Sequence, residues 1–480
     1  MAPAWLAILL VLVPGVAAAQ YIRPPALEPD PAIIQSPRTP PPMTIPSAPE
    51  LAPEARPDLR LQLPGPSPEA VRPTKTFDLK PTIGIFEDYT DNFNRTSQNP
   101  TANFRTGITP GLEVLLDRGN VTGRAFYRLL AFYDSSREEF GTHHELSGQV
   151  SWQATARLKF TLTEAFAQSD EPDQSDRLNL NAGGGRREFS RNLLSLGSEY
   201  SIGIVETKAY YRLSNFDADD QTTRTHNLGG SAAFPIGRIH MLTLGYDYID
   251  SKTTQGRGGS TSTTGFVQGD TTTTGSEITA SFSRDINPRL TAGISAAFAD
   301  RDQTTSTGTD NFRRWNASFF NTYVIPEKIV MRGSIGMAQL QSKTSSDKPI
   351  FTSNTNITYW LGSTIFNFVL ERGFSETFTG GENFGVVETS GVSGSVTYRF
   401  SPLLTGFVRA SYRENEFTGE GGGQAGRKED IATGSLGITY QFLRWLTATF
   451  DYTYTKTTTN EQGASFTENR VRAALNAGFY

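Results

Sequence analysis

The stretch GVSGSVTYRF (residues 391–400) alternates apolar or glycine residues with polar ones, and GSLGITYQF (residues 434–442) and LTATFDYTY (residues 446–454) do the same. Successive side chains of a strand point to opposite faces, so this alternation predicts strands with one apolar and one polar face. A strand that crosses a membrane needs about 9–11 residues, apolar outside the barrel and polar inside. Because strands of water-soluble sandwiches are usually shorter, the three stretches favour a transmembrane β-barrel.

The composition of the whole chain agrees with a barrel. The 480 residues are 37% hydrophobic, a low value that a barrel tolerates because only half of each strand faces lipid. No apolar run reaches the roughly 18 residues that a helical membrane span needs. The net charge of -5 gives no reason to expect a nucleic-acid partner. The absence of cysteine excludes disulfides, thiolate metal sites and a cysteine nucleophile.

Two segments are expected to precede the barrel. Residues 1–19 have the pattern of a signal peptide, with an apolar core at residues 5–16 and Ala17-Ala18-Ala19 before the expected cleavage site. Residues 20–75 are Pro-rich, since residues 21–74 hold 16 of the 27 prolines, and are expected to be a disordered periplasmic linker. A plug for the lumen and a docking strip for a periplasmic partner stay open as alternatives.

Residues 76–480 are predicted to be all-β and to form a single transmembrane antiparallel β-barrel of about 20 strands, within a range of 16–22. Short turns recur at residues 117–120, 155–157, 201–203, 235–237, 285–288, 326–328, 361–363, 401–403 and 442–444. Proline is excluded from central ladders, and its presence in four of these turns supports the segmentation. The turns are expected on the periplasmic rim with both strand termini, and longer loops, such as residues 253–274 and 419–430, on the other rim.

The aromatic residues near the turns and the last strand support the same assignment. Aromatic side chains prefer the membrane interface, so outward positions near the periplasmic rim are expected for Phe400, Tyr440, Phe442, Trp445 and Phe479. The last strand keeps an apolar stripe and ends on an aromatic residue, which is typical of the strand that the barrel-assembly machinery recognises. The residues expected to form this assembly signal are Leu475, Ala477, Phe479 and Tyr480.

The first hairpin resembles a known family. Ile83-Gly84-Ile85 is followed by Tyr89-Thr90-Asp91-Asn92-Phe93 and then by Gly107-Ile108-Thr109-Pro110-Gly111-Leu112. These residues resemble the putative β-barrel porin 2 family, which includes outer-membrane proteins associated with exopolysaccharide and PEP-CTERM systems. The resemblance implies an outer-membrane location and a barrel fold, and it implies no catalytic residue.

The polar face of the predicted strands leans basic. The basic residues expected to line the lumen are Arg124, Arg128, Lys208, Arg212, Arg332, Arg399, Arg409, Arg413, Arg470 and Arg472. The acidic residues expected beside them are Glu206, Asp247, Asp451 and Glu468. A basic ring in a pore raises the local concentration of anions. The alternative is that these side chains pair with acids across strands and only fill a wet lumen.

No catalytic, cofactor or metal site is expected. His143 and His144 are neighbours on one strand and therefore point to opposite faces, which makes them a poor pair of metal ligands. The Gly-rich loops lie between strands and not at a strand-to-helix junction, so they lack the geometry of a phosphate-binding loop. Glu164 falls on the apolar face of its strand, which indicates either a place at the outer rim or an error in register.

The sequence therefore favours a non-enzymatic channel in the outer membrane of a Gram-negative bacterium. The expected function is a pore or export conduit for polar solutes or saccharide chains, with a link to exopolysaccharide export. The alternative is a closed structural or binding barrel whose extracellular loops contact surface polysaccharide. The expected partners are outer-membrane lipid, the barrel-assembly machinery and periplasmic polysaccharide-export proteins, with no nucleic acid.

Overall fold

The computed structural model describes residues 77–171, 186–218, 221–255, 270–305, 308–342, 349–379, 385–418, 426–461 and 464–478. The expected signal peptide (residues 1–19) and linker (residues 20–75) lie outside these ranges. The first strands are β1 (Phe77–Thr90), β2 (Asn103–Ile108), β3 (Gly111–Asp117), β4 (Val121–Asp134), β5 (Glu139–Thr155), β6 (Leu158–Ser169), β7 (Phe189–Ile202), β8 (Val205–Ala218), β9 (Gln221–Ile236) and β10 (His240–Gln255). The remaining strands are β11 (Thr271–Asn287), β12 (Leu290–Thr305), β13 (Gly308–Ile325), β14 (Ile329–Gln341), β15 (Ile350–Leu361), β16 (Thr364–Glu376), β17 (Val386–Arg399), β18 (Leu404–Phe417), β19 (Lys428–Leu443), β20 (Leu446–Thr459) and β21 (Phe466–Gly478).

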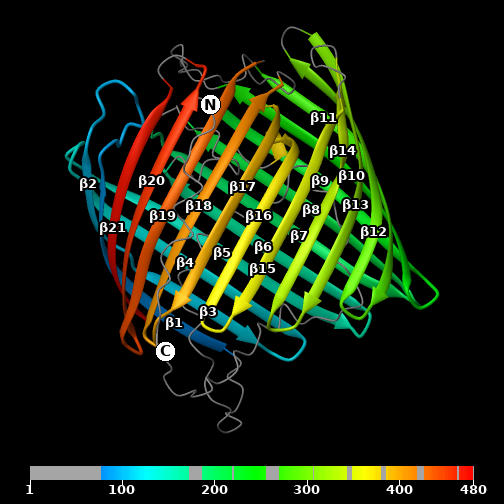
Figure 1. Ribbon diagram of the computed structural model, residues 1–480, viewed down its shortest axis with the longest axis horizontal. Helices are drawn as coiled ribbons and strands as arrows, with labels where there is room; N and C mark the ends of the chain where they lie inside the picture. Colours follow the sequence, from blue (N-terminus) through cyan, green and yellow to red (C-terminus); the bar gives the residue numbers. More distant parts are fainter. Residues whose placement is uncertain are drawn as a thin grey trace, which may run out of the picture.

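The strands form one closed antiparallel barrel of 20 strands, as the alternation predicts (Figure 1). β1 pairs with β21 from Thr82 opposite Gly478 to Thr90 opposite Arg470, so the sheet has no open edge. Closure satisfies the backbone N–H and C=O groups within the sheet, which a bilayer requires because lipid offers them no partner.

β2 and β3 are two pieces of one crossing. Both pair with β1 and both pair with β4, and only Thr109 and Pro110 separate them. Thr109 still exchanges two backbone hydrogen bonds with Gly84, of 2.8 and 3.2 Å, and the Pro110 carbonyl accepts one of 3.0 Å from the Leu129 N–H. The ladder continues past a residue that has no N–H to donate.

The nine predicted short turns lie on one rim, together with the start of β1 and the end of β21 (Figure 1). The other rim is less uniform than expected. Three of its connections, residues 135–138, 219–220 and 306–307, are as short as the turns of the first rim. In these hairpins the strand pairing continues almost to the turn, as Ala218 opposite Gln221 and Thr305 opposite Gly308 show.

The outward face carries exposed apolar side chains. Ile85 is 55% exposed and Ile438 is 49% exposed, as a lipid-facing surface requires. Near the first rim the four described aromatic residues of the predicted interface are all exposed: Phe400, Tyr440, Phe442 and Trp445. Phe479, the fifth, lies outside the described residues.

Glu164 shows that the predicted register was right although the residue is polar. It lies outward in the middle of β6, opposite Gly148 and Leu194, and not at the rim. The Asn192 side chain on β7 donates a hydrogen bond to its carboxylate. The two polar side chains therefore satisfy one another on the lipid-facing side.

Within the described ranges, no helix is long and apolar enough to cross a membrane. η2 (Thr377–Thr379) is a 3₁₀ turn between β16 and β17.

Candidate functional site

The lumen is the candidate functional site, and the strand register determines which side chains face it. Pairing keeps inward residues opposite inward residues all round the barrel. The register places all ten predicted basic residues on the face opposite the exposed apolar residues: Arg124, Arg128, Lys208, Arg212, Arg332, Arg399, Arg409, Arg413, Arg470 and Arg472. The same face holds the four predicted acids Glu206, Asp247, Asp451 and Glu468.

Five of these basic residues have ion-pair partners on the wall. The bonds are Arg124 Nε to Glu113 Oε1 at 2.5 Å, Arg128 Nε to Glu145 Oε2 at 3.1 Å, Lys208 Nζ to Glu199 Oε1 at 3.2 Å, Arg413 Nη2 to Glu371 Oε1 at 3.0 Å and Arg470 Nε to Asp88 Oδ1 at 2.8 Å. These five acids were not predicted from the sequence, although each lies on an inward position of its strand. The ion pairs favour the alternative in which much of the basic excess is neutralised.

The other five basic residues differ among themselves. Arg409 lies 4.3 Å from the centre of the Phe407 ring, and Arg472 lies 5.0 Å from that of Phe86. Arg212, Arg332 and Arg399 make no ion pair with any described residue. Any selectivity for anions depends on this smaller group.

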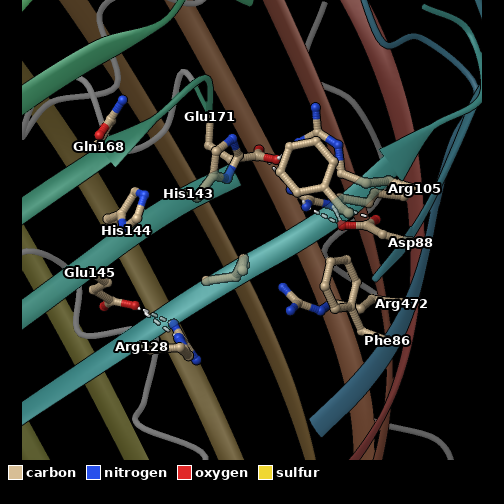
Figure 2. A pocket seen from close by; sticks show the side chains of 13 residues that line it. Phe86, Asp88, Arg105, Arg128, His143, His144, Glu145, Gln168, Glu171 and Arg472 are labelled. Carbon is tan, nitrogen blue, oxygen red and sulfur yellow. Dashed lines mark hydrogen bonds and ion pairs between the residues drawn. The ribbon is translucent and has the colours of Figure 1, made fainter. Parts of the chain in front are cut away.

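The half of the lumen away from the short turns, which is extracellular in the orientation expected from the sequence, contains a first ion cluster, named here the β1–β7 cluster. Its members are Asp88, Arg95, Arg105, Asp134, His143, Asp170, Glu171, Arg186, Glu468 and Arg470. Arg105 reaches Asp170 at 2.8 Å, Asp134 at 2.9 Å and Glu171 at 3.0 Å. Figure 2 shows Arg105, His143 and Glu171 close together on this part of the wall.

The β1–β7 cluster holds the start of the β6–β7 connection inside the barrel. Glu171 follows β6 and accepts bonds from Arg186 at 2.8 Å, Arg105 at 3.0 Å and Arg470 at 3.1 Å. These arginines come from three separate parts of the chain, and the Arg105 and Arg186 guanidinium groups also lie over the Phe93 ring. Buried charges of this kind are stable only when paired and hydrogen-bonded, as these are.

Asp170 lies just beyond the end of β6. Its burial by itself raises the pKa of the carboxyl group, but hydrogen bonds from His143 and Arg105 outweigh burial and lower the pKa below its ordinary value. The carboxylate therefore stays ionised at neutral pH and keeps its bonds in the cluster.

A second ion cluster, named the β11–β16 cluster, lies on another part of the wall. Arg314 contacts Glu277 at 3.0 Å and Glu376 at 3.2 Å, and Arg301 contacts each of the same carboxylates at 3.4 Å. All four side chains are 8% exposed or less. Two positive and two negative charges balance one another away from water.

The connection that follows Glu376 folds into the lumen and is fixed to distant strands. The Phe378 carbonyl accepts hydrogen bonds from Thr225 Oγ1 at 2.7 Å and Ser251 Oγ at 3.2 Å, although η2 follows β16 and the donors belong to β9 and β10. The fully buried Phe378 ring packs in one cluster with Ile249 and Phe312. We call η2 and these contacts the latch.

The two halves of the lumen are therefore packed differently. In the extracellular half the inward side chains are buried on most sides of the barrel, for example Thr253, Arg301, Asn415 and Glu468. Nearer the periplasmic rim the Arg124 side chain is 55% exposed and that of Lys208 is 36% exposed. Water reaches the wall of the periplasmic half and is largely excluded from that of the extracellular half.

The histidines have partners of their own. His143 Nε2 lies 2.9 Å from Asp170 Oδ1, and the outward His144 and His226 bond to Tyr127 and Tyr211. His240 stacks on Phe282. No group of three or more His, Asp or Glu side chains suited to a metal ion occurs among the described residues.

Only part of the expected assembly signal can be placed. Leu475 and Ala477 lie on the outward face of β21, opposite Ala448 and Leu446. Phe479 and Tyr480 lie outside the described residues. Recognition by the assembly machinery stays a prediction.

Comparison with known proteins finds a family model that matches the last quarter of the chain. Residues 359–479 match the family model described as putative beta-barrel porin 2. This is the family that the first hairpin resembles, so that prediction is confirmed, although the match covers the strands from β15 onward and not the first hairpin. Together, the closed barrel and this partial match support an outer-membrane β-barrel.

No curated protein matches the chain. Among solved structures it is similar to the apoprotein form of the FrpB iron transporter from Neisseria meningitidis, with a TM-score of 0.48, 11% identity and coverage of 85% of this chain and 81% of that one. It is also similar to the siderophore receptor PirA from Acinetobacter baumannii, with a TM-score of 0.45, 11% identity and coverage of 84% and 80%. At these values neither structure bears on the substrate of this chain.

Proposed function

We propose that the protein is a pore or export conduit for polar solutes or saccharide chains in the outer membrane of a Gram-negative bacterium, narrowed at its extracellular end. The observation that carries the proposal is the exposure of charged inward side chains, such as Arg124 and Lys208, in the periplasmic half of the lumen. Side chains alone fill a barrel of about eight strands, so one of 20 strands needs water or a plug inside. Charged side chains in contact with water support the aqueous interior.

The narrowing is attributed to the latch and the two ion clusters. They bring parts of the β6–β7 and β16–β17 connections into the lumen from different parts of the wall. A solute that enters from the periplasm first meets a wide vestibule and then the narrowed end. A saccharide chain suits such a path because it is polar along its length and thin in cross-section.

The experiment is a recording of current across a planar lipid bilayer that contains the purified full-length protein. Uniform steps of current are expected. The steps should be larger for a variant whose latch is released than for the wild type, whose latch is intact. A folded barrel that gives no steps, with or without the latch, would exclude the pore.

The second candidate is a closed structural or binding barrel whose extracellular loops contact surface polysaccharide. The burial of inward residues around the extracellular half favours it, because a fully packed end passes no solute. Binding of cell-surface polysaccharide by a barrel that conducts no current would support this candidate over the pore.

The link to exopolysaccharide export and the periplasmic partners belong to the same proposal. They rest on the family resemblance and on the Pro-rich segment, whose composition suits a tether. Deletion of the gene should retain saccharide inside the cells if the protein is an export conduit. Deletion of residues 21–74 alone should have the same effect if that segment recruits export proteins.

A further inference from the structure

A set of polar side chains on β8, β9 and β10 lacks partners just below the latch. Three rows of inward residues cross these strands: Tyr210, Gly229 and Asp247; then Arg212, Asn227 and Ile249; then Ser214, Thr225 and Ser251. The third row holds both donors to the Phe378 carbonyl. The first two rows therefore form the wall that a solute meets immediately before the narrowed end.

Two acceptors in these rows have no hydrogen-bond partner. Asn227 Oδ1 and Asp247 Oδ1 are buried, and no described group donates to either. An unsatisfied buried acceptor costs about 1–3 kcal/mol, so such groups are uncommon without a reason. A ligand that brings hydroxyl donors would satisfy both.

Arg212 supplies donors at the same place. Its guanidinium group lies 4.5 Å from the centre of the Tyr210 ring, and its neighbours in the register, Ser195 and Asn227, are both neutral. It makes no ion pair among the described residues, unlike Arg128 at the corresponding height of β4. Stacking fixes the plane of a guanidinium group and leaves the N–H groups at its edge able to bind oxygen atoms.

Gly229 lies between these groups, and the ends of the Asp247 and Tyr210 side chains occupy the space over it. A Cβ at residue 229 would lie 2.1 Å from Asp247 Oδ1 and 2.6 Å from the Tyr210 hydroxyl, so no other residue fits without displacing both. Both contacts are with the far ends of side chains, so if the Tyr210 ring turns away from the glycine, a ligand hydroxyl can reach the Asp247 and Asn227 acceptors. The glycine thus forms the floor of a shallow subsite.

We propose that Tyr210, Arg212, Asn227 and Asp247 form a saccharide-binding subsite on the inner wall, directly below the latch. The chemistry is that of a sugar: its hydroxyl groups donate to the Asn227 and Asp247 oxygens, and its hydroxyl or carboxylate oxygens accept from Arg212. The subsite deepens the proposed function and rests on it, since a solute must be able to enter the lumen.

The test measures binding without current, so that failure of the subsite and failure of the pore are distinguishable. Full-length barrel in detergent is titrated calorimetrically with a neutral glucose oligomer, with a galacturonate oligomer of the same length and with polyethylene glycol of the same size. Both saccharides should bind saturably, and polyethylene glycol, which has acceptors but no donors along its chain, should not. Tighter binding of the galacturonate oligomer than of the glucose oligomer would indicate that Arg212 binds its carboxylate groups.

The variant Arg212→Gln should raise the dissociation constant of the saccharide at least tenfold, because hydrogen bonds from a charged group are lost. Arg332→Gln is the matched control, since Arg332 is also inward and without an ion pair but lies on β14, and it should bind as the wild type does. Gly229→Val should abolish binding by filling the floor. Equal binding of polyethylene glycol, or equal loss in Arg212→Gln and Arg332→Gln, would overturn the subsite. A barrel that binds saccharide but carries no current would retain the subsite and exclude the pore.

Discussion

The extracellular and periplasmic halves of the lumen belong to the same strands, yet they are packed in different ways. In the extracellular half, the buried charges of the β1–β7 and β11–β16 clusters and the latch join distant strands. In the periplasmic half, inward ion pairs such as Arg124 with Glu113 and Lys208 with Glu199 connect neighbouring strands and remain in contact with water. This difference shows that an inward polar face is not sufficient to form a channel. Whether the polar groups pair along the wall or across the lumen decides how much space is left.

The largest expected effect comes from breaking the β11–β16 cluster. Glu376→Gln leaves Arg301 and Arg314 without one of their two carboxylates, and the free energy of unfolding should fall by about 3–5 kcal/mol. Unfolding by urea in detergent micelles measures this fall in the free energy of unfolding. The control is Glu388→Gln, which removes the 3.0 Å pair with the exposed Arg372 and should cost about 1 kcal/mol or less. Equal losses in both variants would contradict the contrast between buried and exposed pairs.

The next effect concerns Asp170 and pH. The pKa of Asp170 is lowered in the folded protein, so its ionised form contributes stability above the unfolded pKa of about 4, and this contribution is lost as the pH falls through the folded pKa. Asp170→Asn should therefore cost about 1.5–3 kcal/mol at pH 7 and progressively less below pH 4. Urea unfolding of both proteins at pH 7 and pH 3 checks this. A difference that stays constant with pH would show that the charge of Asp170 has no role.

Release of the latch should give a smaller change in stability but a clear change in current. Thr225→Val with Ser251→Ala removes both donors to the Phe378 carbonyl, each worth about 0.5–1.5 kcal/mol. Single-channel conductance should rise because η2 is then free to leave the lumen. The control is Thr243→Val. Thr243 is an inward residue of β10, as Ser251 is, but it lies nearer the periplasm, so this variant should leave the conductance unchanged. Unchanged steps in the double variant would mean that the latch does not narrow the pore.

The smallest expected effect is on ion selectivity. Arg212, Arg332 and Arg399 have no ion pairs among the described residues, so replacing all three with Gln should lower the anion-to-cation permeability ratio by roughly twofold at low salt. Reversal potentials in a salt gradient measure the ratio. Arg413, another of the ten basic residues expected in the lumen, is a poorer choice for this test because it pairs with Glu371. If the triple variant of Arg212, Arg332 and Arg399 has the permeability ratio of the wild type, the inward arginines only support the structure.

The side-chain period of a strand explains where the selected arginines and the described aromatic residues lie. The side-chain period of a strand is two, so one correct assignment on β18, such as Arg409 inward, fixes every other residue of that strand. The same regularity predicted the turns, because proline and glycine mark where a ladder ends. It also placed Pro110 within a crossing but could not predict that the pairing continues through Thr109.

The long-range partners of those side chains could not be predicted from the sequence. Glu371 on β16 is an inward residue like many others, and only the pairing of β16, β17 and β18 brings it to Arg413, 42 positions away in the chain. Thr225 and Phe378 are 153 positions apart, and Arg95 and Glu468 are 373 apart. Nothing in the composition of residues 377–379 indicates that they turn inward.

Local periodicity is enough to predict which face of each strand meets lipid, about how many times the chain crosses the membrane, and which turns share a rim. Only the tertiary structure decided which charges cancel, which loops enter the lumen and where unpartnered oxygens remain. Apart from ion pairs across a single hairpin, such as Arg124 with Glu113, those outcomes depend on contacts between strands that are far apart in the chain. The free energy of a buried charge depends on its partners in space, and alternation along one strand carries no information about them.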